Sequence, residues 1–478
     1  MTEHWQLDPD RALPADPATR DVARVLHRHA ATLPLVSMHG HVDVDVLAAD
    51  EQFSDPAQLF ITPDHYLVRM LVSQGHRHTD LGATRRDTDG SAGEPDRDAR
   101  AIWRLFCANW HLFRGTPTRY WLEHELVEVF DAPAPPSAET ADLLYDHLLD
   151  KIRSADFRPL ALLDRMNVEI LATTDSALAD LRGHAVLAER LGPGRIVPTF
   201  RPDSLVHIGH PTWAAEIARL AEVSDVDTGH YGGFLAALRR RRLAFVAAGA
   251  RATDHGHLSA DTTPLEHNAA ERIYRDALEG TVNPAGAQAF AAHMLFQMAE
   301  MSVEDGLVMQ LHPGVLRDHN SDIHRRFGPD QGFDIPVRVE FTHNLRPLLE
   351  RFGLSSRFRC ILFTTDETVY SRELAPLAGA YPSVRLGAPW WFLDSPEQML
   401  RFRQSAVETA GFYNTSGFVD DTRAFASISA RHDLSRRIDA GYLARLVAEG
   451  RLSMDEAVDT MTDLAHRLAR TAYAAPTS

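Results

Sequence analysis

Cysteine is scarce in this sequence, and two longer features are missing. Only Cys107 and Cys360 occur among the 478 residues, which excludes a disulfide framework and a zinc site built from cysteines. No run of 18 or more apolar residues exists, so we expect no transmembrane helix. The first residues, MTEHWQLDPDRALP, lack a basic region followed by an apolar one, so we expect no signal peptide. These absences favour a cytoplasmic protein with buried, reduced thiols.

Basic residues are also fewer than acidic ones. The sequence has 49 lysines and arginines against 66 aspartates and glutamates, a formal net charge of −17 at pH 7. An acidic surface repels nucleic-acid phosphates, so we expect no nucleic acid as a partner, and without an apolar span we expect no membrane. Apolar residues make up 44% of the chain, an ordinary share for a globular protein with a large core. The composition therefore excludes classes of partner without indicating an activity.

Eight short apolar runs recur along the chain, and each ends in polar residues that could serve a site. They are rich in Val, Ile, Leu and Phe and too short for helices, which is typical of buried parallel strands. The runs span 35–41, 168–175, 195–203, 243–257, 306–314, 359–367, 383–391 and 415–423. Segments with helical periodicity separate them. The pattern predicts an α/β fold, a (β/α)₈ TIM barrel whose active site lies at the carboxyl ends of the strands.

The gap between the first two runs is far longer than one crossover needs. It contains helical patterns such as AIWRLFCANWHLF, so we expect a large helical insertion after strand 1. The expected parts are an N-terminal helical segment, a barrel made of two stretches, the insertion, and C-terminal helices packed on the barrel. In that order they span 1–33, then 34–44 with 160–435, then 45–159, and finally 436–478.

Four pairs of histidines are spaced one residue apart, at 27/29, 39/41, 76/78 and 255/257. On a strand, residues i and i+2 share a face and can bind one ion, whereas on a helix they point about 200° apart. The first pair lies in a helical pattern, the third in a polar stretch expected to be solvated, and the direction of the fourth is undetermined. Only His39 and His41 end a predicted strand, so we predict that these two bind a metal.

A third metal ligand has to come from another strand end. The sequence VDDTR ends the eighth run, which lies beside the first once a barrel closes, and it offers Asp420 and Asp421. By alternation one of them faces the barrel and the other faces the helices. His312 is a further candidate, or else a hydrogen-bonded core residue. Two histidines and a carboxylate with open positions are typical of catalytic zinc sites.

This combination, HxH after strand 1 and aspartate after strand 8, resembles the amidohydrolase superfamily. Further motifs resemble one of its families, the uronate isomerases (glucuronate isomerases). They are DHYLVRM at 64–70, TTDS at 173–176, FRPD at 200–203, DHGH at 254–257, VMQLHPG at 308–314, GAPWWF at 387–392 and DDTRAF at 420–425. The motifs cover most of the chain in the expected order, so the resemblance is far more specific than HxH alone.

The resemblance implies aldose–ketose isomerisation of hexuronates, D-glucuronate to D-fructuronate and D-galacturonate to D-tagaturonate, by proton transfer through a cis-enediol. It implies one divalent metal, zinc, bound by His39, His41 and Asp421. The fourth run contains no lysine that could bridge two metals, which also favours a single ion. Other residues match family positions near the substrate: His65, Tyr66 and Arg423 as catalytic groups beside Asp421, and Arg201 and His312 as substrate-binding groups.

The chemistry of the residue types supports parts of this assignment and leaves others open. The planar fork of Arg201 binds carboxylates bidentately. Trp390 can stack on a sugar ring or pack at the rim of the barrel. Asp421 can act as the base or position a water that does. Alternative functions are a metal-dependent hydrolase or decarboxylase of the same superfamily, or an inactive sugar-binding barrel. The partners we expect are a small-molecule hexuronate and, in a homo-oligomer, further copies of the chain.

Overall fold

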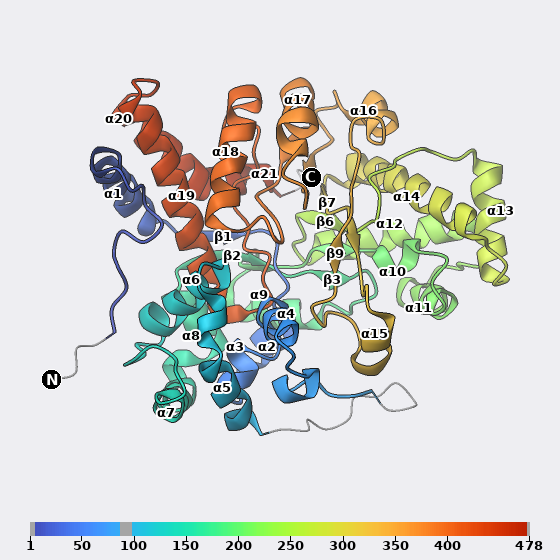
Figure 1. Ribbon diagram of the computed structural model, residues 1–478. Helices are drawn as coiled ribbons and strands as arrows, with labels where there is room; N and C mark the ends of the chain where they lie inside the picture. The colour runs from blue at the N-terminus through green and yellow to red at the C-terminus, as the bar shows by residue number, and fades with distance from the viewer. Residues whose placement is uncertain (1–4, 87–97, 476–478) are drawn as a thin grey trace.

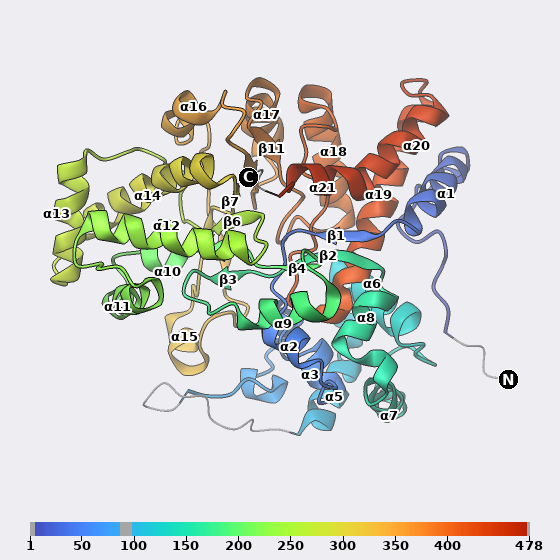
Figure 2. The ribbon, with the colours of Figure 1, turned by 180° about the vertical axis from the view of Figure 1, so that it is seen from behind.

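The computed structural model describes residues 5–86 and 98–475, and it is an α/β structure built on parallel strands. Figure 1 shows short strands at the centre with helices around them, and Figure 2 shows the same arrangement from behind. The parallel strands are β1 (Leu35–Ser37), β2 (Val168–Ala172), β3 (Asp175–Ser176), β4 (Ile196–Val197), β5 (Phe200–Arg201), β6 (Ala252–His255), β7 (Val308–Leu311), β10 (Cys360–Leu362) and β11 (Val384–Leu386). A separate antiparallel pair is formed by β8 (Val315–Leu316) and β9 (Ile335–Pro336).

The parallel strands form two sheets that continue one another. The first has the order β1-β2-β4 and the second the order β11-β10-β7-β6-β5-β3. Backbone hydrogen bonds cross the breaks between β2 and β3 and between β4 and β5. The N–H of Thr173 donates to Val197 O and that of Asp175 to Thr199 O, both at 3.0 Å. Neighbouring strands in space are therefore neighbouring runs in the sequence, as predicted for the first seven runs.

The eighth run forms no continuous strand in the described chain. A single parallel bridge joins Thr415 to Leu386, and no strand follows. Gly417 and Asp421 have φ angles of 78° and 45°, which lie in the left-handed region and interrupt an extended backbone. The segment still lies beside β1, because Asp421 N–H donates to His39 O at 3.1 Å.

Two other strand boundaries also differ from the prediction. β1 ends at Ser37, so His39 and His41 lie beyond the strand rather than on it. The fourth run begins inside a helix, because its alanine-rich start favours helix. Gly249, with φ of 94°, follows the end of that helix, and β6 starts only at Ala252.

Helices fill the long gap between β1 and β2. They are α2 (Val44–Ala49), α3 (Pro56–Phe60), α4 (His65–Ser73), α5 (Ala99–Ala108), α6 (Pro117–His124), α7 (Ala141–Ile152) and α8 (Pro159–Arg165), with short turns η1 (His78–Leu81), η2 (Trp110–Phe113), η3 (Glu125–Val129) and η4 (Ala155–Phe157). Each of α2 to α6 begins after an aspartate or threonine whose side chain accepts a backbone N–H of the first turn. Capping residues in the sequence thus determine where these helices begin.

The remaining helices follow the later strands and the two ends of the chain. They are α1 (Pro17–Ala31), α9 (Arg182–Leu191), α10 (Asp203–Val206), α11 (Trp213–Ser224), α12 (Tyr231–Ala247), α13 (His267–Leu278), α14 (Pro284–Asp305), α15 (Ser321–Phe327), α16 (Arg346–Phe352), α17 (Ala375–Ala380), α18 (Pro396–Ala410), α19 (Ile428–Ala448), α20 (Met454–Thr462) and α21 (Leu468–Ala472), with η5 (Tyr370–Leu374), η6 (Phe425–Ser427) and η7 (Asp463–Arg467). α1 packs on α19 and α20. The expected boundary between 435 and 436 falls inside α19, which is one continuous helix.

The apolar core lies on both sides of the strands. Inward-facing side chains of successive strands, among them Val36, Ile170 and Val308, belong to one buried cluster that Tyr473 also joins. The opposite strand faces pack against the surrounding helices in two further clusters. Cys107 and Cys360 are buried and free. In the part of the chain that is described, no helix is long and apolar enough to cross a bilayer.

Candidate active site

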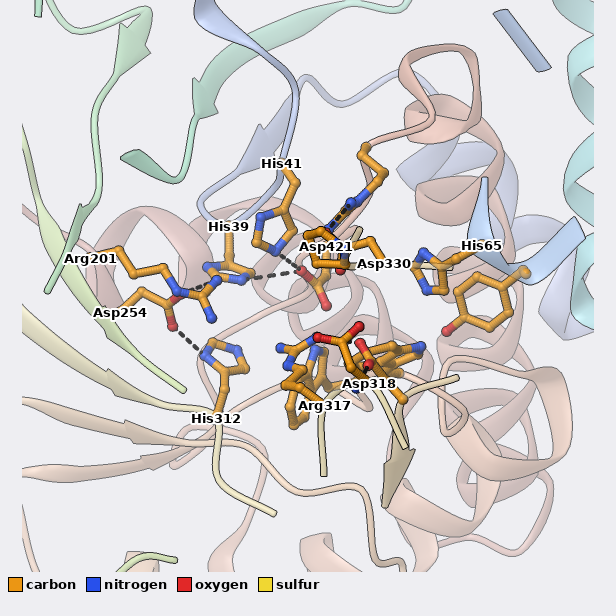
Figure 3. Close-up of a pocket in the computed structure, with 16 residues that line it drawn as sticks. His39, His41, His65, Arg201, Asp254, His312, Arg317, Asp318, Asp330 and Asp421 are labelled. Atoms are coloured by element: carbon orange, nitrogen blue, oxygen red, sulfur yellow. Dashed lines mark hydrogen bonds and ion pairs between the residues drawn. The ribbon is translucent and has the colours of Figure 1, made fainter. Parts of the chain in front are cut away.

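A cavity of about 260 Å³ opens at the carboxyl ends of the parallel strands. Figure 3 shows the side chains that line it. Nine of the candidate site residues lie in its wall: His39, His41, His65, Tyr66, Arg201, His312, Trp390, Asp421 and Arg423. The wall also contains Asp254, Arg317, Asp318, Pro329, Asp330, Asp334 and Trp391. Residues distant in the sequence meet here because parallel strands bring their carboxyl ends to one edge.

His39, His41 and Asp421 converge on one side of the cavity (Figure 3). Asp421 Oδ1 lies 3.2 Å from His39 Nε2 and 3.0 Å from His41 Nε2. One ligand atom of each residue lies within 4.8 Å of the other two. Asp421 Oδ1 is buried, yet it accepts no hydrogen bond of normal geometry from any described residue. Two imidazole nitrogens that approach a carboxylate oxygen in this way fit a divalent metal.

The backbone fixes this arrangement where the last run meets the first. Asp421 has a φ of 45°, a left-handed conformation that costs a residue with a side chain about 1–3 kcal/mol. Two hydrogen bonds compensate for it: Asp421 N–H donates to His39 O at 3.1 Å, and His41 N–H donates to Thr422 O at 2.9 Å. Asp420 faces the other way, with Oδ2 at 3.2 Å from His432 Nε2 on α19. Only one of the two adjacent aspartates therefore reaches the cavity.

Charge in the cavity keeps Asp421 ionised. Burial opposes its ionisation, but the adjacent His39 and His41 hold the pKa of its carboxyl well below the usual range. Burial alone would lower the pKa of His39, whereas Asp254 and Asp421 raise it. Burial lowers the pKa of His41. The carboxylate is thus in the form that binds a cation at neutral pH.

Asp254 of β6 links Arg201 to His312. His312 Nδ1 lies 2.6 Å from Asp254 Oδ1, and the Arg201 guanidinium lies 3.3 Å from Asp254 Oδ2. His39, Asp254 and His312 form a second group whose ligand atoms are close together. Because Asp254 and His312 already bind each other, the group with Asp421 is the better metal site. Burial lowers the pKa of His312 to about 4, so its imidazole is neutral.

His65 and Tyr66 enter the cavity from the first turn of α4 in the insertion. Asp64 begins this helix by accepting the N–H of Tyr66 at 2.8 Å. The His65 and Tyr66 rings stack with centroids 4.8 Å apart. Burial, aided by Arg423, lowers the pKa of His65 to about 3. The Tyr66 hydroxyl donates to Asp394 at 2.9 Å and accepts the Phe392 N–H at 3.1 Å. Its proton is therefore already used in the hydrogen bond to Asp394.

Three arginines line the cavity, and each contacts an aspartate. The Arg423 guanidinium lies 2.9 Å from Asp330 Oδ2. Arg317 donates to Asp334 at 2.9 Å and lies over the Trp391 ring, 4.7 Å from its centroid. Arg201 Nε donates to Asp203 at 2.8 Å in addition to its contact with Asp254. A guanidinium group that keeps an N–H free beside such an ion pair is suited to a ligand with a carboxylate.

The family model for glucuronate isomerase matches residues 18–472. The chain belongs to the glucuronate isomerase family. A uronate isomerase of Phenylobacterium zucineum is 50% identical over 473 residues, which is 99% of this chain and 98% of that protein. A uronate isomerase of Rhizobium meliloti is 50% identical over 468 residues, which is 98% of this chain and 99% of that protein.

Solved structures of the family have the same fold. The glucuronate isomerase of Caulobacter crescentus superposes with a TM-score of 0.95 at 45% identity, covering 98% of this chain and 97% of that one. The uronate isomerase of Thermotoga maritima superposes with a TM-score of 0.90 at 26% identity, covering 98% of this chain and 100% of that one. This member of the glucuronate isomerase family is therefore related to those enzymes over its whole length.

Several cavity residues of this family member were missed in the sequence. Asp254 is the first residue of the motif DHGH, in which only the histidines were considered as ligands. Because side chains alternate between the two faces of β6, the Asp254 side chain points into the cavity. Arg317, Asp330 and Asp334 belong to the connection between β7 and α16. These three residues lie outside the short elements β8, α15 and β9 of that connection, so no periodic pattern in the sequence marks them.

The other histidine pairs lie in different environments. His27 and His29 are on α1 as predicted, where each ring contacts a separate residue. His78 was expected to be solvated, and that expectation is wrong. Its side chain is buried and its ring stacks on Phe327 of α15, with centroids 5.2 Å apart. The polar stretch around it packs against another polar segment, which composition does not reveal.

Proposed function

We propose that the protein interconverts aldohexuronates and ketohexuronates, D-glucuronate with D-fructuronate and D-galacturonate with D-tagaturonate. The observation that carries the proposal is the cavity itself, where a possible metal-binding triad lies beside three arginines. A uronate uses both. It has oxygens near its reacting carbons, which a metal can polarise, and a carboxylate, which an arginine can bind. The full-length relation to uronate isomerases supports the same reaction.

We infer that the strands close into a (β/α)₈ barrel through the eighth run. Leu386 N–H donates to Asn414 O at 2.8 Å, and Ser416 N–H donates to Leu386 O at 2.9 Å, which joins this run to β11. On its other side, Asp421 N–H bonds to His39 O. Inward-facing residues of the strands share one core cluster with Phe418 and Val419 of this run. Both edges of the strand array thus meet the same segment.

We infer that one divalent metal, zinc, binds to His39, His41 and Asp421. Two nitrogen ligands and one carboxylate match the ligand set of catalytic zinc sites. The unbonded Asp421 Oδ1 is the feature of this structure that fits a metal there. When bound, such an ion acts as a Lewis acid that polarises substrate oxygens.

The remaining residues have roles that follow from their environments. Arg201 uses Nε on Asp203 and one amino group on Asp254, which leaves further N–H groups for the substrate carboxylate. Asp421 is ionised and accepts the proton from C2, then returns it to C1, while the proton of the C2 hydroxyl passes to O1. The atoms of the substrate are thereby conserved.

His65, Tyr66 and Arg423 assist at the same site. Neutral His65 has Nε2 buried without a hydrogen-bond partner among the described residues, so this atom is available to a substrate hydroxyl. Tyr66 acts through its contact with the His65 ring, because its own hydroxyl is held by Asp394. Arg423 stabilises negative charge that develops on substrate oxygen. Trp390, whose ring centroid lies 4.8 Å from that of His312, closes the cavity beside it.

The hydrolase and decarboxylase alternatives have no comparable support. A structure described as a metal-dependent hydrolase, from Lactobacillus casei, superposes with a TM-score of 0.55 at 13% identity, a likeness of fold alone. The relatives from Phenylobacterium zucineum, Rhizorhabdus wittichii and Rhizobium meliloti, which are about half identical to this chain, are uronate isomerases.

The test is incubation with D-glucuronate or D-galacturonate in D₂O, followed by NMR. We expect the ketose to form and deuterium to enter product or recovered substrate, because the base exchanges its proton with solvent. Asp421→Asn should abolish both. Release of CO₂ or another small product without any ketose would overturn the proposal.

A further inference from the structure

A second cluster of side chains of the types that bind metals lies on the opposite face of β6 from the substrate cavity. Along this strand Ala252 packs in the inner core and Asp254 lines the cavity, so Thr253 and His255 face the helices. Asp203, His255 and His257 each have a ligand atom within 4.8 Å of the other two. Of the described residues that line the substrate cavity, none belongs to this cluster.

The two histidines have ring nitrogens that nothing in the described chain satisfies. His255 Nδ1 and His257 Nε2 are buried and lack a hydrogen-bond partner there. Buried polar atoms are nearly always bonded, so each such atom calls for an explanation. Thr253 Oγ1 lies 2.9 Å from His255 Nε2 and can accept a hydrogen bond from an Nε2–H group. In that tautomer the free lone pair of the imidazole is on Nδ1. A metal-binding histidine is commonly fixed in this way through its other nitrogen.

A backbone N–H group holds the carboxylate of the cluster. Gly256 N–H lies 3.2 Å and 3.1 Å from Oδ1 and Oδ2 of Asp203. A Cβ at Gly256 would come within 2.9 Å of Asp203 Oδ2 and 2.7 Å of the Arg201 guanidinium, so a side chain would disturb this contact. Arg201 donates to Oδ2, and Oδ1 keeps a free lone pair.

The charge balance tolerates a cation despite the adjacent arginine. Arg201 carries one positive charge, and it lies between the carboxylates of Asp203 and Asp254. A separate cavity of about 510 Å³, lined by His207, His210 and His257, lies beside the cluster. Of the three cluster residues, His257 alone lines this cavity, and none lines the substrate cavity.

We propose that Asp203, His255 and His257 bind a second divalent cation of the zinc type, outside the substrate cavity. Two imidazole nitrogens and one carboxylate oxygen favour zinc and its neighbours over magnesium or calcium, which prefer oxygen ligands. The site joins the start of α10, which follows β5, to the end of β6 through Asp203 and His255. It shares Asp203 with Arg201 but none of its three ligands lines the substrate cavity, so zinc binding here and isomerisation can be measured separately.

The experiment measures zinc bound by the full-length protein after metal removal and equilibrium dialysis against Zn²⁺. Wild type should bind two equivalents, and His257→Gln and His255→Gln should each bind one. The double variant His39→Gln/His257→Gln should bind none. The matched control is His210→Gln, which removes a histidine from the same cavity wall but outside the cluster and should keep two equivalents.

Two results would overturn the proposal: equal zinc binding by wild type and His257→Gln, or an equal loss in His210→Gln. If the substrate cavity held no metal, wild type would bind one equivalent and His257→Gln none, which would still support the second site. Anomalous scattering at the zinc edge from crystals of wild type needs no variant. It should give a peak between the three side chains, and its absence would count against the site even if the variants do not fold.

Discussion

Arg201 holds a buried carboxylate, that of Asp254, and a half-buried one, that of Asp203, in addition to facing the substrate cavity. Its contacts are 2.8 Å to Asp203 and 3.3 Å to Asp254. An uncharged replacement would remove the positive charge beside both carboxylates, and breaking a buried ion pair such as the one with Asp254 costs about 3–5 kcal/mol of stability. A test of carboxylate binding at this position therefore has to keep the positive charge.

We expect Arg201→Lys to raise the KM for D-glucuronate with little change in stability. Lysine keeps the charge between the aspartates but lacks the planar fork that binds a carboxylate bidentately. Loss of one charged hydrogen bond costs about 1.5–3 kcal/mol, or about 10- to 150-fold in kcat/KM. Steady-state kinetics and urea unfolding separate the two effects. Unchanged kinetics would show that Arg317 or Arg423 holds the carboxylate instead.

We expect His41→Ala to remove metal and activity together. The residue supplies one of three ligands, and even changes in groups around a metal site typically cost about 10- to 100-fold in affinity or activity, so the loss should be at least about 100-fold. His76→Ala is the control, because it belongs to another histidine pair and to none of the possible ligand groups among the described residues. Bound zinc and turnover are measured on the same samples. Equal losses in both variants would contradict the assignment.

At the scale of elements, the sequence predicts most of what places the site. Short apolar runs indicate the first seven strands and their order, because burial on both faces leaves an unmistakable apolar pattern. The eighth run is also apolar, but the left-handed Gly417 and Asp421 prevent an extended backbone there. Asp330 could not be predicted, because it comes from an irregular connection whose position depends on tertiary packing alone.

The helix α4 carries two cavity residues, and its first turn depends on Asp64. We expect Asp64→Ala to lower the free energy of unfolding by about 1 kcal/mol, the usual cost of losing a cap, and to reduce kcat because His65 and Tyr66 lose their fixed position. Asp98→Ala is the control. Asp98 caps α5 by accepting Arg100 N–H at 2.9 Å, but α5 contributes nothing to the cavity wall described here. Urea unfolding and kinetics should separate the variants; equal kcat values would refute the positioning role.

At the scale of the whole molecule, one buried carboxyl makes stability depend on pH. Burial raises the pKa of Asp175 to about 6, above the value of about 3.9 in an unfolded chain. The folded state then binds the proton more tightly, so this group stabilises the protein below about pH 4. The contribution is lost as pH rises to about 6.

We expect Asp175→Asn to become more stable relative to wild type by about 3 kcal/mol as pH rises from 4 to 7, since about two pKa units correspond to that free energy. The amide keeps an acceptor for the Thr173 hydroxyl, which lies 2.7 Å from Asp175. Urea unfolding of both proteins at several pH values measures the difference. Parallel stability curves would show that Asp175 ionises normally in the folded protein.

The metal of the substrate cavity would join the two ends of the strand array, because His41 follows β1 and Asp421 lies in the last run. An ion that binds only the folded state stabilises it by about 4 kcal/mol when its free concentration is about 1,000 times the Kd. We therefore expect zinc to raise the urea midpoint of the His257→Gln protein, in which the second cluster is disabled. The rise should disappear when His41→Ala is added. If both proteins respond equally to zinc, the stabilising ion binds elsewhere and His41 does not help to close the fold.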